Sequence, residues 1–561
     1  VNNNNNNNHN NSQQSVAHVR RFFSLLQQEE YKSLEYPNAK EPPEITKTVA
    51  SQVRGQAPRK SQDVVVPEGG TTLTPTELPA LSAEFVQSLK ARPFSPGVSA
   101  ITKEIPPAIP PNVPAHELET PHTMVTQLDN GVRVVSMETY GQVSVVGAVS
   151  ALGSQWEQGP SQAHSTQLLE ALAFGTTQKR DGLAVAHALQ DWGGTRFVNS
   201  GREQSLHCID VLRPNVDKAM GLLTECLLEP LFDPLEVEEA KQVIQHQAMD
   251  LPPELWLGEA LQVAAYGEDQ SLGQPHFCPP GTTLDHLTAA SIEQYWKTHF
   301  LDNPREIVIA GAGVRHDTLI RLAEQNFGHL QHQDHPERKL KPTVYRGGQC
   351  NIPHSSPHTE DDEFVRVGLV WPACGWHGDD LVATCVLQTL LGGGNSFSAG
   401  GPGKGMYSRL YRHVLNGYKW AESAEATTAF YNDTGLWGLT GKCVPKQATN
   451  LIKVLAEQAV RLAIQPVTDE ELDRARNMLK NNVLTQLESR LVLFEDMGRQ
   501  VLTYGKREDM LTTCTRIDSI TQEDLMRVAR MSLQHPPSLA AVGKNLDYVP
   551  RQDEVAAWFR G

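Results

Sequence analysis

The sequence predicts an α+β protein with two duplicated α/β domains, each an antiparallel-rich sheet packed with helices. Two observations carry this prediction. From about Thr123 onward, segments with strand periodicity alternate with segments of helical periodicity. In addition, three pairs of short segments recur in the same order and at nearly the same spacing, which is the signature of an internal repeat.

Each repeated pair places similar residues on the same kind of element. The pairs are Asp285–Ile292 with Asp518–Leu525 (518 − 285 = 233), Ile307–Gly311 with Leu539–Gly543 (543 − 311 = 232) and Glu238–Lys241 with Asp473–Arg476 (473 − 238 = 235). We therefore expect one domain over residues 120–330 and a second over 360–548, with a linker at 331–359 and a tail at 549–561.

The region before these domains has a different composition. Residues 2–15 are rich in Asn and Gln, a composition that buries too little apolar surface to fold. Residues 16–26 alternate basic and apolar side chains, carry Arg20 and Arg21 and lack acids, so residues 1–26 resemble a mitochondrial transit peptide. A basic tail without a targeting role is the alternative. Residues 27–119 are rich in Pro and polar residues, which predicts a disordered extension.

The expected elements follow in order. Asn130-Gly131 between two apolar runs predicts a β-hairpin. A buried strand follows at 143–151, helices at 161–174 and 182–191, a strand at 204–212, and helices at 214–227 and 234–250. Apolar helical patterns at 381–391 and 407–415 flank the most glycine-rich stretch of the chain.

Composition excludes several classes of protein. The chain of 561 residues has a formal net charge of −16, whereas a nucleic-acid-binding protein is expected to be basic. It contains no apolar run of 18 residues, so no transmembrane helix is expected. The eight cysteines form no C-x-x-C pair, which favours buried thiols in a reducing compartment.

Residues 392–405 form a glycine-rich loop, in which seven of fourteen residues are glycine. It is not a nucleotide-binding loop, because the phosphate motif would need Gly at Ser398 and Ser or Thr at Gly405. Glycine in a surface loop permits close backbone approach or movement. We therefore expect the loop to offer its backbone to an extended peptide, with Phe397 and Met406 giving apolar contacts.

No complete metal site is visible. An inverted zincin carries H-x-x-E-H on a helix, but here the frame reads Gln167-x-x-Glu170-Ala171. A single carboxylate does not hold zinc, so this segment is expected to be an ordinary core helix. His164 and Glu170 do not share a helix face. His329, His332 and His335 have helical spacing but lie where the helical pattern ends.

The glycine-rich loop, written GGGNSFSAGGPGKGMYSRLY over 392–411, resembles that of the alpha subunits of mitochondrial processing peptidases. These belong to the pitrilysin-like metallopeptidases, a family related to the core proteins of ubiquinol–cytochrome c reductase. Further stretches resemble the same subunits in the same order: Leu128–Val134, Glu170–Thr177, Ala264–Tyr266, Phe277–Pro279, Ile309–Val314, Asp433–Gly435 and Leu487–Val501.

The resemblance implies a clam-shaped heterodimer in which a beta subunit holds zinc. Matched residue by residue, the zinc ligands fall on Gln167, Ala171 and Ala240, and only Glu170 survives, as a remnant. This chain is then a non-catalytic subunit with no metal or cofactor of its own. The implied substrate-binding residues are Gly392, Gly393, Gly394, Asn395, Ser396, Phe397, Ser398, Ala399, Gly400, Gly401, Pro402, Gly403, Lys404 and Gly405.

The implied ligand is a cationic presequence, and the charge distribution agrees with it. The first 60 residues carry 8 Lys and Arg against 5 Asp and Glu, so the remainder carries −16 − 3 = −19. An acidic cavity would attract such peptides, although surplus acid also serves solubility. The implied location is the mitochondrial matrix. The alternative is a core structural subunit of complex III, peripheral on the matrix side of the inner membrane, and the two roles are compatible.

Overall fold

The computed structural model describes residues 121–559, apart from 336–337, 339, 356–362 and 396–405. The predicted transit peptide and the Pro-rich extension lie outside the described residues. No helix in the described ranges is long and apolar enough to cross a membrane. All eight cysteines are free thiols; four are buried and four are partly exposed.

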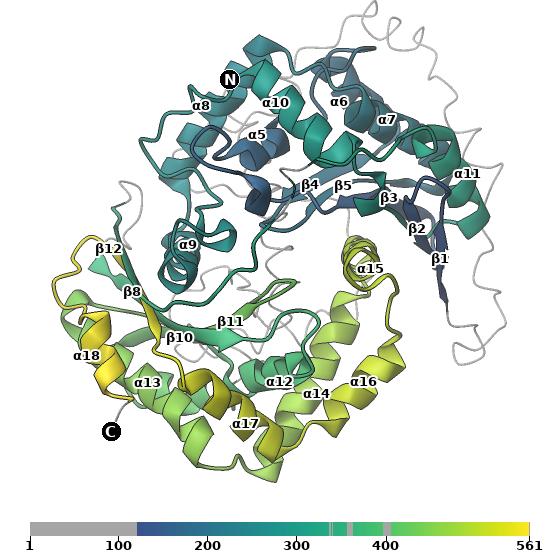
Figure 1. Ribbon diagram of the computed structural model, residues 1–561. Coiled ribbons are helices and arrows are strands. Elements are labelled where there is room, and N and C mark those ends of the chain that lie inside the picture. Colours follow the sequence, from purple (N-terminus) through teal and green to yellow (C-terminus); the bar gives the residue numbers. More distant parts are fainter. Residues whose placement is uncertain (1–120, 336–337, 339, 356–362, 396–405, 560–561) are drawn as a thin grey trace, which may run out of the picture. The chain divides into compact units, whose positions relative to one another are not determined.

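The N-terminal half, from β1 to α11, is an α+β unit (Figure 1). Its strands are β1 (Thr123–Gln127), β2 (Arg133–Met137), β3 (Val143–Ser150), β4 (Thr195–Ser200), β5 (Ser205–Leu212) and β6 (Ile307–Ala312). Its helices are α5 (Ser165–Leu172), α6 (Gly182–Asp191), α7 (Val216–Leu228), α8 (Pro234–Asp250), α9 (Pro253–Tyr266), α10 (Ala289–Trp296) and α11 (His316–Phe327).

The C-terminal half, from β7 to α18, has the same mixed character. Its strands are β7 (Gln349–Pro353), β8 (Val365–Ala373), β9 (Gly393–Asn395), β10 (Ala421–Phe430), β11 (Gly435–Cys443) and β12 (Ser538–Gly543). Its helices are α12 (Leu381–Leu391), α13 (Ala448–Ile464), α14 (Asp469–Gln486), α15 (Arg490–Tyr504), α16 (Met510–Ser519), α17 (Gln522–Leu533) and α18 (Gln552–Ala557). A short π-helix, η8 (Tyr411–Leu415), precedes β10.

The two sheets have six strands each, and five of these follow the same order, with β1 added at one end of the first sheet and β9 at the opposite end of the second. The first sheet runs β1-β2-β6-β3-β5-β4 and the second β7-β12-β8-β11-β10-β9. In each, one parallel pair (β2 with β6, β7 with β12) interrupts an otherwise antiparallel arrangement. The α+β prediction with two similar α/β units is therefore confirmed; the exact domain boundaries stay predictions.

The repeated segments occupy equivalent elements. Ile307–Gly311 lies in β6 and Leu539–Gly543 in β12, and each of these strands has one parallel and one antiparallel neighbour. Thr288 caps α10 and Thr521 caps α17, both in a capping box. Lys241 pairs with Glu238 on α8 at 2.6 Å, as Arg476 pairs with Asp473 on α14 at 2.9 Å.

Most expected elements are found, with two differences at α5 and η8. The hairpin, the strand at 143–150 and the helices at 182–191, 234–250 and 381–391 match the prediction. Helix α5 is shorter than the expected 161–174, because His164 and Phe174 at its two ends have left-handed φ angles of 64° and 58°. Of the expected helix at 407–415, residues 409–415 are helical, including η8.

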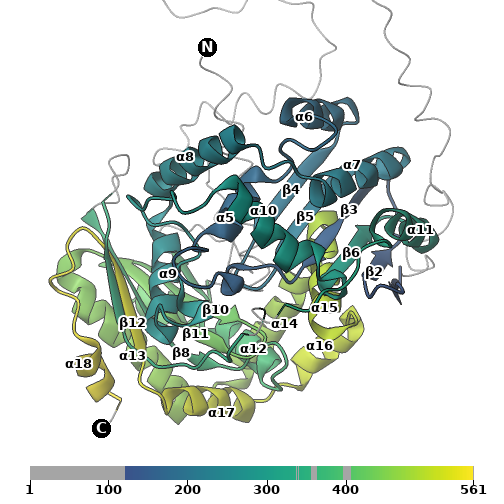
Figure 2. The same ribbon diagram turned by 45° about the horizontal axis from the view of Figure 1, so that its top comes forward.

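Each half contributes one helix to the other half's sheet. One face of the first sheet packs on helices of its own half, and the other face packs on Leu493, Phe494, Met497 and Val501 of α15. Conversely, Trp256, Leu257 and Leu261 of α9 cover the second sheet, whose opposite face packs on helices of its own half. Figures 1 and 2 both show α9 beside the second sheet, and contacts join α15 to β3 and β6.

The hairpin turns of the two sheets also meet. Glu203, in the turn between β4 and β5, accepts the backbone N–H of Asn432, in the turn between β10 and β11, at 2.9 Å. The neighbouring Gln204 accepts a hydrogen bond from Arg499 of α15 at 3.0 Å. These contacts and the exchanged helices join the two halves.

Candidate functional site

Helix α5 carries Gln167, Glu170 and Ala171, the residues that the sequence analysis compared with an inverted-zincin motif. The side-chain oxygen of Gln167 accepts the backbone N–H of Cys278 at 2.8 Å. Glu170 accepts the backbone N–H of Ser200, at the end of the outermost strand β4, at 2.8 Å. Burial raises the pKa of the Glu170 carboxyl to about 7. Both side chains therefore serve as hydrogen-bond acceptors for neighbouring backbone.

The two alanines complete this arrangement. Ala171 is exposed on α5, and Ala240 is buried on α8, which packs against α5. Zinc is bound by thiolate, imidazole or carboxylate, and methyl groups supply none of these. The donor set at α5 and α8 therefore does not fit a zinc ion. Across the described ranges, no three His, Cys, Asp or Glu residues lie together as metal ligands would.

The other histidines considered from the sequence make separate contacts. His164 is buried at the start of α5, and burial lowers its pKa to about 4. His332 contacts Asp334 at 3.1 Å, whereas His335 contacts Asp302 at 2.9 Å. These pairs involve different acids.

The glycine-rich loop leaves the second sheet at its edge. Of the predicted substrate-binding residues, Gly392 to Asn395 are described, and Ser396 to Gly405 lie outside the described residues. Gly393 to Asn395 form β9, which pairs with β10 as the outermost strand. Gly393 has φ 111°, and a Cβ atom there would lie 1.9 Å from the carbonyl oxygen of Ala424. Only glycine permits this approach.

The two ends of the loop are tied together. Ser408 is buried, and its hydroxyl accepts the backbone N–H of Gly393 at 3.1 Å. A Cβ atom on Gly392 would lie 2.4 Å from the Cβ of Ser408. The close fit of glycine against serine therefore holds Ser408, which follows the loop, against the start of β9.

Beside this base, the surface is apolar and anchored to α14. Met406 and Tyr407 are exposed by 37% and 63%. The Arg474 guanidinium lies 5.6 Å from the centre of the Tyr407 ring, and Arg409 donates to both carboxylate oxygens of Glu471 at 3.2 Å. The loop thus starts from a fixed base next to accessible aromatic and apolar side chains.

The sequence had given no signal for several of these contacts. The partners of Glu170 and Gln167, which are Ser200 and Cys278, lie far along the chain from them. Ser408 lies beyond the glycine-rich loop from its partner Gly393, and the sequence does not define the path of that loop. The resemblance identifies Gln167 and Gly393, but only the structure shows what each one contacts.

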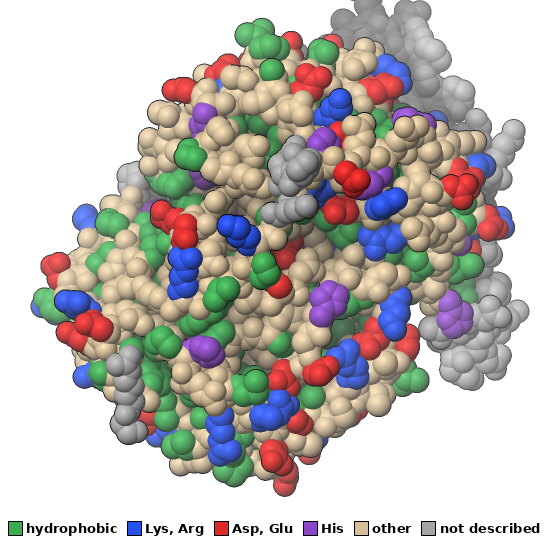
Figure 3. Space-filling model, viewed as in Figure 1, with side chains coloured by type: hydrophobic (Ala, Val, Ile, Leu, Met, Phe, Trp, Pro, Cys, Tyr) green, Lys and Arg blue, Asp and Glu red, His purple; other side chains and the backbone are tan. Residues whose placement is uncertain are grey.

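Charge on the visible face is mixed. Figure 3 shows Lys and Arg side chains interspersed with Asp and Glu over this face. The predicted acidic surplus is therefore not gathered into one field on this side.

Comparison with known proteins gives two family matches and a consistent set of relatives. Residues 133–280 match the family described as "Insulinase (Peptidase family M16)", and residues 286–479 match "Peptidase M16 inactive domain". A probable mitochondrial-processing peptidase subunit alpha-1 of Arabidopsis thaliana is 32% identical, over 81% of this chain and 88% of the relative. The mitochondrial-processing peptidase subunit alpha of Homo sapiens is 31% identical (76% and 82%), and a probable one from Schizosaccharomyces pombe is 32% identical (77% and 86%).

Proposed function

This chain belongs to peptidase family M16 and, within it, to the alpha subunits of mitochondrial-processing peptidases, and from this we propose that it is a non-catalytic, presequence-binding subunit. In this role it pairs with a zinc-bearing beta subunit in the mitochondrial matrix. The chain binds cationic presequences through the glycine-rich loop, and the partner cleaves them. No metal or cofactor is assigned to this chain.

The observation that carries the proposal is the contrast between α5 and the loop. At α5, the positions of the metal ligands are taken by Gln167, Ala171 and Ala240, and the remaining Glu170 is used as a backbone acceptor. At the base of the loop, glycine is sterically required where the chain enters β9. The chain therefore lacks the donors for zinc chemistry but keeps a constrained loop base.

The loop base supports binding of an extended peptide. Because β9 is the outermost strand of the second sheet, the base lies at a sheet edge, where backbone pairing with a peptide is a recurring mode of recognition. Tyr407 and Met406 offer apolar contacts beside it. Backbone contact explains how one loop can accept presequences of different sequence.

The test is reconstitution with a beta subunit. A chain in which residues 396–405 are replaced by a short turn keeps Gly393 and Ser408 and should still form the heterodimer. We expect presequence affinity, measured by fluorescence anisotropy, to fall by about tenfold or more because loop contacts are lost. Wild-type affinity in this variant would contradict the proposal.

Two matched variants separate backbone from side-chain roles. Lys404→Gln should change affinity by less than about twofold, because a peptide bound through backbone contacts does not depend on this charge. Glu170→Gln should leave the cleavage rate within about twofold, since a residue outside the chemistry does not alter the transition state. Cleavage by this chain alone would overturn the non-catalytic assignment.

A core structural role in complex III is the second candidate, because the family includes the core proteins of that complex. Purification of the native protein from mitochondria distinguishes the assemblies. Co-migration with a beta subunit alone indicates a matrix heterodimer. Co-migration with cytochromes indicates a location on the matrix side of the inner membrane.

A further inference from the structure

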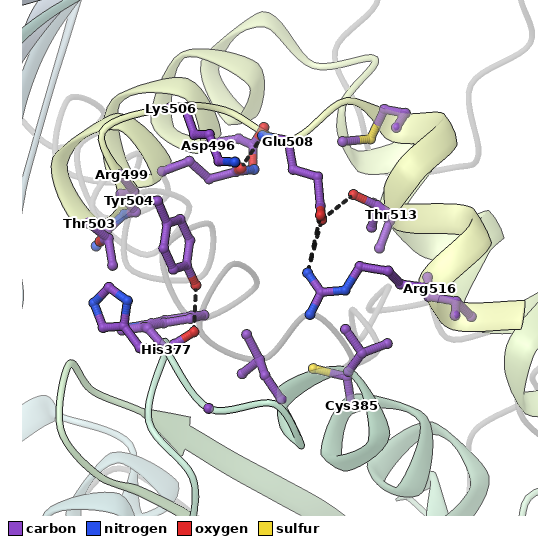
Figure 4. A pocket seen from close by; sticks show the side chains of 18 of the residues that line it. His377, Cys385, Asp496, Arg499, Thr503, Tyr504, Lys506, Glu508, Thr513 and Arg516 are labelled. Carbon is purple, nitrogen blue, oxygen red and sulfur yellow. Dashed lines mark hydrogen bonds and ion pairs between the residues drawn. The ribbon is translucent and has the colours of Figure 1, made fainter. Parts of the chain in front are cut away.

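A cavity of about 430 Å³ is lined by residues of the C-terminal half and by Gln204, and its lining includes none of the loop-base residues Gly392–Asn395 and Ser408. Helices α12, α14 and α16 line it on one side, and α15 together with residues 376–379 lines it on the other. Figure 4 shows Asp496, Lys506 and Glu508 on one side of the cavity and Cys385 on the opposite side. Its size lies within the range of pockets that hold small organic ligands.

The helical side of the cavity is apolar apart from Thr513 and Arg516 of α16, which contact Glu508. The side chains of Leu381, Val382 and Cys385 come from α12, those of Leu479 and Val483 from α14, and those of Met510 and Ile517 from α16. Cys385 is buried, and burial raises the pKa of its thiol to about 12, so it lines the cavity as a neutral group. The aliphatic and thiol side chains on this side therefore favour an apolar ligand segment.

Most charged groups around the cavity are already paired. Asp496 accepts from Gln500 at 2.7 Å and from Arg507 at 2.6 Å. Glu508 accepts from Arg516 at 3.2 Å and from Thr513 at 3.1 Å. Arg499 donates to Glu495 at 2.8 Å and to Gln204 at 3.0 Å.

Three ionisable groups remain at the opening of the cavity. Lys506 is exposed, and among the described residues it has no ion-pair or hydrogen-bond partner. Asp379 and His377 are also exposed, and the His377 ring lies edge-on to Tyr504 with 5.3 Å between ring centres. The opening thus offers one uncompensated ammonium group, with one carboxylate on the opposing loop.

We propose that this cavity binds an aliphatic chain that ends in a carboxylate, with the chain against α12, α14 and α16 and the carboxylate at Lys506. An apolar interior with a cation at its opening is complementary to such an amphiphile. This site is separate from the presequence role and does not depend on the glycine-rich loop. The carboxylate of Asp379 would repel the carboxylate of the ligand. Removing the charge of Asp379 therefore tests the charge of the ligand's head group.

The test uses the full-length chain and two probes with the same chain and opposite heads, dodecanoate and dodecyltrimethylammonium, below their micelle concentrations. Calorimetry should show binding of dodecanoate in preference to the ammonium probe. Lys506→Gln should weaken dodecanoate by about threefold, as expected for a partly exposed ion pair, and Asp379→Asn should tighten it. Preference for the ammonium probe, or the opposite signs in the two variants, would overturn the proposal.

A steric variant tests the position. Met510→Trp should fill the cavity and weaken dodecanoate by about tenfold or more, because the ligand loses its space. The control is Leu511→Trp on the same helix, where the side chain is 79% exposed and outside the cavity lining, and binding should be unchanged. Equal loss in both variants, or none in either, contradicts this location. Replacing residues 396–405 should leave dodecanoate binding intact even where presequence binding is lost.

Discussion

The two halves of the molecule share the order of five strands and a helix exchange but bury different chemistry. The described interior of the N-terminal half contains titratable groups with shifted pKa values: His164, His207, His276, His299, Glu157, Glu170 and Glu203. Among the described residues, the C-terminal half has no buried histidine; its core is filled by large apolar side chains such as Trp371, Trp437 and Phe430, and its buried groups with a raised pKa include the Cys385 and Cys443 thiols and the Glu495 carboxyl. The comparison teaches that the duplicated fold depends on sheet and helix packing, whereas the chemistry of each interior is free to diverge.

The largest expected effect concerns α15, which belongs to one half and packs on the sheet of the other. Arg499 and Glu495 pair at 2.8 Å with side chains only 4% and 3% exposed. Arg499→Met leaves the Glu495 carboxylate buried without its partner, which should lower the free energy of unfolding by about 3–5 kcal/mol. Denaturant titration measures the change.

The control is an ion pair with the same spacing on a helix surface. Arg461 and Glu457 on α13 pair at 2.6 Å, but their side chains are 45% and 50% exposed. Arg461→Met should cost less than about 0.5 kcal/mol, because exposed helix pairs contribute little. Similar losses of unfolding free energy in the two variants would show that the contribution of the Arg499–Glu495 pair does not come from its burial.

The next effect compares the cost of replacing glycine at the base of the glycine-rich loop with the cost at an ordinary turn. Gly393→Ala introduces a Cβ atom 1.9 Å from the Ala424 carbonyl oxygen at a φ of 111°, so β9 must move off β10. We expect a loss of about 2–4 kcal/mol from backbone strain and lost strand pairing. Gly159→Ala is the control, since its φ of 73° is also positive but no atom lies within 4 Å of the added Cβ. It should cost about 1 kcal/mol, and equal costs would contradict the steric argument.

These variants also show what the sequence could and could not predict. Helices α6 and α8 were predicted at their exact bounds, because Asp181 and Asp233 cap them and give a clear start. Strand β4 was not predicted, since Thr195–Ser200 has no regular apolar alternation.

The exchange of α9 and α15 had no sequence signal. An apolar face shows that a helix is buried but does not say which sheet it covers, and both helices follow directly on helices that stay in their own half. At the site, the motif indicated Gln167, Glu170 and the loop. The contacts with Cys278, Ser200 and Ser408 depend on tertiary structure and could not be predicted.

The pH dependence should differ between the halves. Burial lowers the pKa of His164, His207 and His276 to about 4 and that of His299 to about 3. Stability from these neutral histidines is fully present above the unfolded pKa near 6.5 and is lost as pH falls toward 4. Burial raises the pKa of Glu157, Glu170 and Glu203 to about 7, so their contribution is present below about 4.5 and is lost as pH rises through 7.

The two sets oppose each other between pH 4.5 and 6.5, and because the four histidines outnumber the three carboxyls, we expect stability to fall as the pH decreases over this range. Hydrogen exchange followed by mass spectrometry should show the protection of β3 and β5 falling with decreasing pH over this range. His207→Leu should flatten this slope. An unchanged slope in that variant, or the same slope for β8 and β11, would contradict the contrast between the halves.

The smallest expected effect concerns Gln167 and the hydrogen bond that its side chain accepts. Gln167→Met keeps the length of the side chain but removes the acceptor for the Cys278 N–H, so it should cost about 1 kcal/mol, the net value of one hydrogen bond. Gln190→Met on α6 is the control, because that side chain is exposed, and it should change the unfolding free energy by less than about 0.5 kcal/mol. A cost confined to position 167 would mean that the Gln167 side chain holds the Cys278 segment against α5. The N-terminal half would then be stabilised by a polar contact of this helix, whereas the C-terminal half keeps strained glycine at the base of its loop.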